Sequence, residues 1–178
     1  MARPIALVGL PGSGKSTVGE LLATRLGCTW CDVDGELEQL SGWSASRWIE
    51  EKGLPAFRAA EALFLARLAA ERTSAPQEQG SLVVATGGGA VETAEVRQIL
   101  ACWSCFWLDA PDPVLLERCG SGSRPLLPAE GASSALQQLR GTRQLHYRQL
   151  AGEPIDTSDC TPSTIVDVIL GRLEEDLG

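Results

Sequence analysis

The sequence has little of what several large classes of protein require. Its 178 residues carry a formal net charge of −8, the pI is about 4.7, and no basic cluster is evident. Because binding to a nucleic-acid backbone requires a basic face, the composition argues against nucleic acid as a partner. No apolar run approaches the roughly 20 residues that span a bilayer, so we expect no membrane partner and a cytoplasmic location.

Histidine is scarce as well, and its scarcity bears on catalysis. His146 is the only one in the chain, and no serine or cysteine nucleophile motif surrounds it. The sequence therefore does not indicate a nucleophile activated by histidine, and we expect His146 on the surface of a helix.

Cysteine is present in six copies, four of them in two C-x-x-C pairs. Cys28 pairs with Cys31 and Cys102 with Cys105 in this spacing, which can belong to a zinc or redox site. Each pair, however, straddles the entry to a predicted strand. We therefore predict burial as small apolar residues, with metal or disulfide chemistry as the less favoured alternative.

The most informative stretch is segment 9–16, Gly-Leu-Pro-Gly-Ser-Gly-Lys-Ser, which fits G-x-x-x-x-G-K-[ST]. It lies between an apolar run at 5–8 and a helical pattern at 17–26, the context that a phosphate loop requires. The backbone N–H groups of such a loop and the helix N-terminus after it bind phosphate oxygens. Lys15 would reach the β- and γ-phosphates of a nucleotide, and the Ser16 hydroxyl would bind Mg²⁺.

The order of the predicted elements favours a three-layer α/β domain with a parallel sheet. Strands are expected at 3–8, 29–32, 81–85, 102–108 and 154–157. Helices are expected at 15–26, 35–40, 44–52, 55–72, 93–100, 113–118 after an Asp112 N-cap, 133–150, and in a last stretch that ends near 177. The length fits one domain, 1–178.

Two carboxylates, Asp32 and Asp34, lie at the carboxyl end of the second predicted strand, where ligands bind in open parallel sheets. The third strand ends in Thr-Gly-Gly-Gly and offers no carboxylate for Mg²⁺. We therefore assign Asp32 to Mg²⁺, directly or through water, and Asp34 to orienting an acceptor hydroxyl and taking its proton. The alternative is that the pair supplies a helix N-cap and a solvated carboxylate.

Three consecutive glycines, Gly87, Gly88 and Gly89, follow the third strand. Such a run costs conformational entropy on folding and suggests that the backbone closely approaches a ligand or another backbone. A plain turn would need fewer glycines.

Arginines suited to carboxylate or phosphate recognition lie near such marked segments. Arg58 lies beside an apolar stripe, with Glu61 three residues later and close enough to orient the guanidinium. Arg124 lies in a glycine- and proline-rich segment at about 120–132 that is predicted to be a lid. Arg143 is the third candidate in this group. For Arg140 and Arg148 we expect solvated positions on a helix.

Together these segments resemble the shikimate kinase family nearly from end to end. Only the phosphate loop is decisive alone, but the order and spacing of the pieces are specific. The matching pieces are 9–16, Asp32-Val33-Asp34, Phe57-Arg58-Ala59-Ala60-Glu61, Gly87-Gly88-Gly89-Ala90-Val91, Arg124-Pro125-Leu126-Leu127, Arg143 with Tyr147, and Asp156-Thr157 followed by Pro162.

The resemblance implies a fold and a reaction. The fold would be a P-loop NTPase sheet of strand order 2-3-1-4-5 with a helical substrate-binding subdomain at about 34–62 and a lid. The reaction would be transfer of the γ-phosphoryl group of MgATP to the 3-hydroxyl of shikimate, in aromatic amino-acid biosynthesis. ATP and shikimate would be the partners of a monomer.

Roles carry over to the matching residues. Lys15, Asp34 and Arg124 would be catalytic, with Asp34 as the base and the two cations stabilising the transferring phosphoryl group. Ser16 and Asp32 would hold Mg²⁺. The implied ATP-binding residues are Gly12, Ser13, Gly14, Lys15, Ser16, Thr17, Arg118, Arg124 and Pro162. The predicted shikimate-binding residues are Asp34, Arg58, Gly87, Gly88, Gly89 and Arg143, with Arg58 and Arg143 on its carboxylate.

Two alternatives stay open. The first is another small-molecule kinase on the same fold, acting on gluconate or a nucleotide; the second is a nucleotide-binding domain without turnover. One departure from the family concerns substrate affinity: Gly53-Leu54-Pro55 stands where family members usually have Gly-Glu, so any polar contact of that glutamate is missing.

Overall fold

A computed structural model describes residues 3–74, 81–120, 126–127 and 130–175. Its strands are β1 (Ile5–Val8), β2 (Thr29–Asp32), β3 (Leu82–Ala85), β4 (Ser104–Asp109) and β5 (Ile155–Asp156). Its helices are α1 (Lys15–Leu26), α2 (Val33–Ser41), α3 (Ala45–Lys52), α4 (Leu54–Ser74), η1 (Ala90–Glu92), α5 (Ala94–Leu100), α6 (Asp112–Cys119), α7 (Ala132–Ala151) and α8 (Pro162–Glu175).

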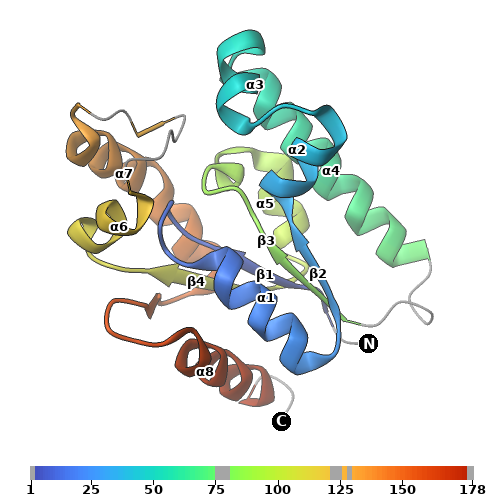
Figure 1. Cartoon of the computed structure of the whole chain (residues 1–178). Helices are drawn as coiled ribbons and strands as arrows, with labels where there is room; N and C mark the ends of the chain where they lie inside the picture. Colours follow the sequence, from blue (N-terminus) through green and yellow to red (C-terminus); the bar gives the residue numbers. More distant parts are fainter. Residues whose placement is uncertain (1–2, 75–80, 121–125, 128–129, 176–178) are drawn as a thin grey trace.

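The strands form one parallel sheet in the order β2-β3-β1-β4-β5, which confirms the predicted fold class and strand order. β1 lies in the middle, with Ile5 opposite Val83 of β3 and opposite Ser104 of β4. The segments that follow β1, β2 and β3 therefore begin at one edge of the sheet, beside one another (Figure 1).

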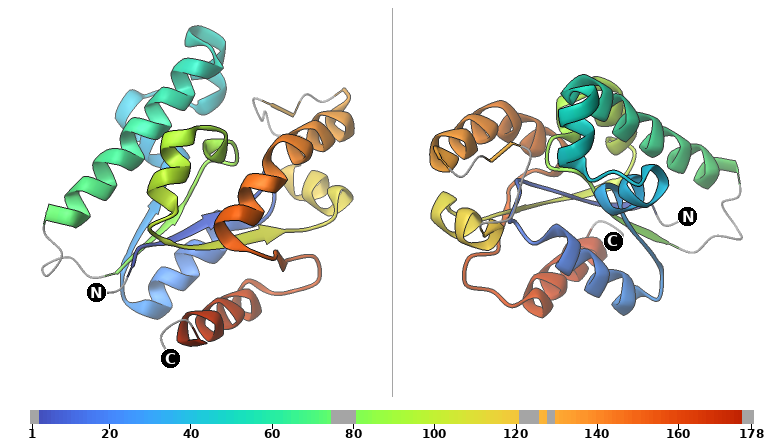
Figure 2. Two further views of the ribbon diagram at one scale, coloured as in Figure 1. Left: turned by 180° about the vertical axis from the view of Figure 1, so that it is seen from behind. Right: turned by 45° about the horizontal axis from the view of Figure 1, so that its top comes forward.

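Alternate residues of the central strand belong to two apolar cores, one on each face of the sheet. Ile5 and Leu7 pack in the core beneath α1 and α8, whereas Ala6 and Val8 pack in the larger core with α4, α5 and α7. The helices accordingly form a layer on either side of the sheet (Figure 2). This alternation is the period of two expected for strands that are covered on both faces.

Several element boundaries agree with local signals in the sequence. Gly27 ends α1 in the left-handed conformation, and the Ser44 side chain accepts a hydrogen bond from the backbone N–H of Arg47 at the start of α3. Thr161 caps α8, since its hydroxyl accepts from the N–H of Thr164. Each of these caps satisfies backbone groups that a helix end leaves unpaired.

Two expectations about polar side chains near α6 were wrong. Asp112 is not the N-cap, because α6 begins at Asp112 itself after Pro111. Arg140 is not a solvated helix residue: it forms ion pairs with Asp109 (2.5 Å) and Asp112 (2.8 Å) and donates to the carbonyl of Ala110. The arginine thus ties α7 to the end of β4, and Asp112 is its partner instead of a cap.

The remaining expectations on single residues had mixed outcomes. Arg148 is exposed, as predicted, whereas His146 is half-buried on α7. All six cysteines are free thiols. The burial predicted for the C-x-x-C pairs is wrong for Cys102, which is exposed, and Cys28 is half-buried. Cys31 in β2 is buried and Cys105 in β4 is half-buried, and burial raises the pKa of each thiol to about 12. Among the described residues, no helix has the length and apolar character needed to cross a membrane.

Candidate active site

The loop between β1 and α1 has the conformation of a phosphate cradle. Gly12 and Gly14 have φ values of 80° and 90°, which favour glycine, and a Cβ on Gly12 would lie 2.4 Å from the carbonyl oxygen of Leu115. The Lys15 ammonium donates to the carbonyls of Gly9 (2.9 Å) and Leu10 (3.0 Å). The lysine therefore lies folded over the loop that a phosphate group would enter.

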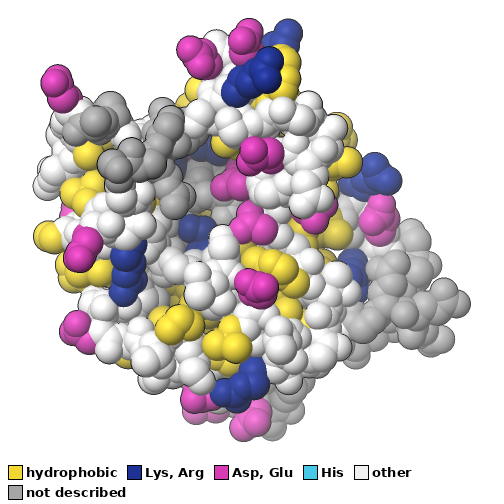
Figure 3. Space-filling model, in the orientation of Figure 1, with side chains coloured by type: hydrophobic (Ala, Val, Ile, Leu, Met, Phe, Trp, Pro, Cys, Tyr) yellow, Lys and Arg dark blue, Asp and Glu magenta, His cyan; other side chains and the backbone are white. Residues whose placement is uncertain are grey.

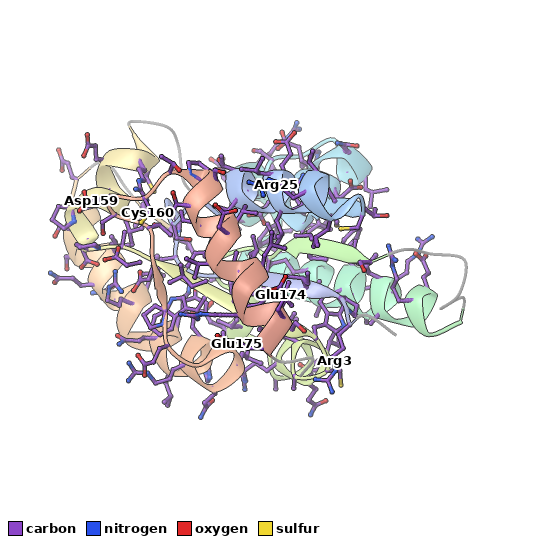
Figure 4. The ribbon with its side chains drawn as sticks, turned by 90° about the horizontal axis from the view of Figure 1, so that it is seen from below. Arg3, Arg25, Asp159, Cys160, Glu174 and Glu175 are labelled. Atoms are coloured by element: carbon purple, nitrogen blue, oxygen red, sulfur yellow. The ribbon has the colours of Figure 1, made fainter. Side chains whose placement is uncertain are left out.

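A cavity of about 440 Å³ opens beside this loop. Arg118 borders it, held by hydrogen bonds to the Thr157 hydroxyl (2.9 Å) and the Ser158 carbonyl (3.0 Å). Asp159 and Cys160 lie in the loop that leads into α8 (Figure 4). The lining residues are Gly12, Ser13, Gly14, Lys15, Ser16, Thr17, Val18, Arg118, Thr157, Cys160, Pro162 and Ile165. The structure thus brings together every predicted ATP-binding residue except Arg124, which lies outside the described residues.

The predicted metal ligands are adjacent. The Ser16 hydroxyl donates to Asp32 Oδ2 at 2.5 Å, and Asp32 Oδ1 accepts from the backbone N–H groups of Asp34 and Gly35. Asp32 is therefore the N-cap of α2 as well as the partner of the phosphate loop. One hydroxyl and one carboxylate suit Mg²⁺, which usually adds phosphate and water oxygens. Within the described ranges, no group of three or more His, Cys, Asp or Glu side chains could hold a metal ion.

A second cavity, of about 130 Å³, adjoins the first and shares Lys15 and Ser16 with it. Its other lining residues are Pro11, Asp32, Asp34, Ala45, Ile49, Phe57, Arg58, Glu61, Thr86, Gly87, Gly88, Gly89, Leu126, Leu127 and Arg143. All of the predicted shikimate-binding residues are among them. Figure 3 shows dark blue Lys or Arg side chains recessed in the hollow between the helices at the top and those at the left.

Two guanidinium groups dominate this smaller cavity, and both are paired with carboxylates. Arg58 on α4 forms an ion pair with Glu61, which is fully buried, and lies 3.3 Å from Glu92. Arg143 on α7 is buried and donates from Nε to Glu92 at 3.1 Å. The Tyr147 hydroxyl donates to the Gly88 carbonyl and links α7 to the glycine segment.

The glycine run is needed because charged side chains lie against its backbone. A Cβ on Gly87 would lie 2.1 Å from Glu61 Oε1, and a Cβ on Gly89 would lie 1.8 Å from Arg58 Nη2. The sequence predicted close approach to a ligand or another backbone; instead, charged side chains lie against Gly87 and Gly89, and only Gly88 is close to another backbone, with its Cβ position 3.3 Å from the Gly9 carbonyl oxygen. Any larger residue would force these groups apart.

The environment of Glu61 strongly perturbs its pKa. Burial raises its pKa from 4.5 to about 7; the nearby Asp34 carboxylate adds to the rise, and Arg58 offsets part of it.

Sequence reasoning gave no role to Glu92 or Tyr147. Glu92 lies three residues after the glycine run, and in the structure its carboxylate contacts two arginines. The only signal in the sequence was an acidic residue near the glycine run. That signal becomes specific only once α4, α7 and η1 are known to meet. Arg124 and most of segment 120–132 lie outside the described residues, although Leu126 and Leu127 line the smaller cavity.

Comparison with known proteins places this arrangement in context. The family model described as shikimate kinase matches residues 11–174. A shikimate kinase of Synechococcus elongatus is 39% identical over 168 residues, covering 92% of this chain and 84% of the relative. The solved structure of a shikimate kinase from Acinetobacter baumannii in complex with shikimate superposes with a TM-score of 0.90 at 31% identity, covering 99% of this chain and 95% of that one. A gluconokinase from Sinorhizobium meliloti, at 21% identity and a TM-score of 0.58 over 98% of this chain and 95% of that one, shares the fold.

Proposed function

Because this chain belongs to the shikimate kinase family, we propose that it transfers the γ-phosphoryl group of ATP to the 3-hydroxyl of shikimate, giving ADP and shikimate 3-phosphate. The observation that carries the proposal is the pair of guanidinium groups in the small cavity that shares Lys15 with the phosphate loop. An acceptor with a carboxylate at Arg58 and Arg143 would have its ring between these cations and the nucleotide. Its hydroxyl can then face the phosphoryl group in line.

The nucleotide occupies the larger cavity, with its phosphates in the loop 9–16. Lys15 leaves the Gly9 and Leu10 carbonyls and donates to the β- and γ-phosphates, where it stabilises the charge that spreads over the transferring group. Arg118 and Pro162 flank the adenine. Ser16 and Asp32 would hold Mg²⁺, which would neutralise phosphate charge.

Asp34 accepts the proton of the acceptor hydroxyl. It lines the same cavity as Arg58 and Gly88, so a ring held by the guanidinium groups lies within its reach. Arg124 adds a second cation at the phosphoryl group, by analogy with arginine fingers. This assignment stays a prediction from the sequence.

Two segments of the chain have roles in this proposal: residues 34–62 form the substrate-binding subdomain, and residues 120–132 form the lid. Leu126 and Leu127, which line the acceptor cavity, support a lid that excludes water and so prevents hydrolysis of ATP. The monomeric state and the cytoplasmic location stay predictions.

ADP release by the purified protein with MgATP tests the proposal. We expect turnover with shikimate, and none above an acceptor-free control with gluconate or a nucleoside monophosphate. Quinate keeps the carboxylate on a different ring, so its turnover relative to shikimate measures how selective the cavity is for the shape of the ring. Turnover with gluconate or a nucleotide but not with shikimate would overturn the acceptor assignment. ATP binding without any turnover would favour a non-catalytic domain.

A further inference from the structure

Glu92 makes contacts that the assigned roles do not use. It ends the short helix η1, and its carboxylate contacts both arginines of the acceptor cavity: Oε2 lies 3.3 Å from Arg58 Nη2, and Oε1 lies 3.1 Å from Arg143 Nε. A second contact joins Arg143 Nη2 to Oε2 at 3.4 Å. One carboxylate therefore bridges guanidinium groups from two helices, α4 and α7.

The two guanidinium groups need such a bridge because they lie very close together. A Cβ on Gly89 would be 1.8 Å from Arg58 Nη2 and 2.9 Å from Arg143 Nη2, so both cationic ends converge on the same point. Like charges at this separation repel strongly inside a protein, where water does not screen them. An anion that contacts both guanidinium groups offsets this repulsion before any ligand binds.

The second glutamate of the cluster does not supply this bridge. Glu61 forms an ion pair with Arg58 three residues before it on α4, which fixes one guanidinium from its own helix. Arg143 is 2% exposed, and among the described residues its ion pair is with Glu92. Loss of the Glu92 charge would leave a buried cation beside a second cation, which favours displacement of the Arg143 side chain.

Glu92 lies outside the cavity that the two arginines line. The cavity wall includes Arg58, Arg143 and Gly89, but Glu92 is not among its lining residues, and its side chain is 31% exposed. A ligand can therefore enter the cavity without displacing the Glu92 carboxylate. Glu92 therefore supports the guanidinium groups from behind. It does not compete with a ligand for the N–H groups that face the cavity.

We propose that Glu92 is a positioning residue that sets the spacing of Arg58 and Arg143 and so determines selectivity for an acceptor with a carboxylate; this rests on the proposed function. The contact between acceptor carboxylate and guanidinium groups exists in both the ground and transition states. Loss of the spacing therefore raises KM for the acceptor and leaves kcat nearly unchanged. The KM for ATP does not depend on it.

The test compares Glu92→Gln with Glu95→Gln, a matched loss of charge at an exposed residue three positions away on α5. Each variant is assayed with shikimate and with its methyl ester, which lacks the anion. We expect E92Q to raise KM for shikimate about tenfold and to lower the preference for shikimate over the ester by a similar factor. E95Q should match the wild type. Thermal unfolding of each variant and the KM for ATP verify that the protein is folded.

Three results would overturn the inference. An unchanged KM would mean that Glu61 and the surrounding packing suffice to position the pair. A lower KM for shikimate in E92Q would mean that the glutamate competes with the acceptor. Equal losses with shikimate and the ester would indicate a general structural role.

The KM of Glu92→Asp for shikimate should lie between those of wild type and E92Q, because aspartate keeps the charge with a shorter reach. Absence of shikimate turnover by the wild type would count against the proposed function instead, because the inference is judged on ratios between variant and wild type.

Discussion

At the scale of single residues, Glu61 shows how the acceptor cavity combines burial with charge. Its side chain is fully buried, its Oε2 pairs with Arg58, and its Oε1 has no hydrogen-bond partner among the described residues. Burying such an unpaired oxygen costs more free energy when the carboxyl group is ionised than when it is protonated. The carboxyl accordingly has a pKa near 7, and the free energy of unfolding must depend on pH through this group.

The sign of this dependence follows from the direction of the pKa shift. Between the ordinary pKa of 4.5 and the folded value of about 7, the folded state binds more protons than the unfolded state. The stabilising contribution is therefore complete below pH 4.5 and is lost as the pH rises through 7. We expect wild-type stability relative to Glu61→Gln to fall by roughly 2–3 kcal/mol between pH 5 and pH 8.

Urea unfolding of both proteins at several pH values measures this difference. Glutamine keeps the size of the side chain and cannot ionise, so titration of all other groups cancels in the comparison. Parallel curves for wild type and E61Q across this pH range would show that Glu61 titrates normally.

Residues that join distant parts of the chain were the ones that sequence reasoning misjudged. Arg140 looked like a solvated helix charge because its partners, Asp109 and Asp112, are about thirty residues earlier. Glu92 had no assigned role for the same reason. By contrast, the i, i+3 pair of Arg58 and Glu61 was predicted, since one helix alone places its two members together.

At the scale of elements, local chemistry predicted most boundaries. Strand β2 and helix α1 have the predicted bounds, and α1 ends at Gly27 in the left-handed conformation. β4 begins two residues later than predicted, at Ser104, because Cys102 and Trp103 turn back onto α5 through hydrogen bonds to Ile99 and Leu100. An apolar run alone does not distinguish such a turn from the first residues of a strand.

Two helical glycines give a matched prediction on element packing. A Cβ on Gly19 of α1 would lie 2.1 Å from the Trp30 ring of β2, whereas a Cβ on Gly171 of α8 would have no atom within 4 Å. Gly19→Ala should destabilise the protein by about 1–3 kcal/mol through overpacking. Gly171→Ala should stabilise it by roughly 0.5–1 kcal/mol, since alanine restricts the unfolded chain.

Chemical denaturation of the two variants against wild type provides the measurement. Since both changes add one methyl group to a helix, only the surroundings differ. A stabilising Gly19→Ala would mean that the Trp30 ring moves aside freely, and the close contact of α1 with β2 would then not constrain the fold.

At the scale of the whole molecule, the parallel sheet gathers the site. The segments that follow β1, β2 and β3 begin at one edge, which brings Lys15, Asp34 and Gly88 to adjoining cavities. This convergence could be predicted from the sequence, because the carboxyl ends of parallel strands share an edge. The ionic bridge between α4 and α7 could not, since it depends on how two helices pack above that edge.

Coupling between nucleotide binding and global stability gives the final prediction. A ligand at a hundredfold excess over its Kd stabilises the folded state by about 2.7 kcal/mol. For a domain of this size that corresponds to an increase in Tm of roughly 5–10 °C.

Lys15 and Lys52 are the two lysines of the chain, and Lys52 is exposed at the end of α3. With Mg²⁺ and a non-hydrolysable ATP analogue, Lys52→Ala should show the wild-type increase. Lys15→Ala should show an increase of no more than about 2 °C at the same concentration, because the charge that meets the phosphates is gone. A full increase in Lys15→Ala would mean that the loop backbone binds the nucleotide without its lysine, and the role of Lys15 would then be confined to the transition state.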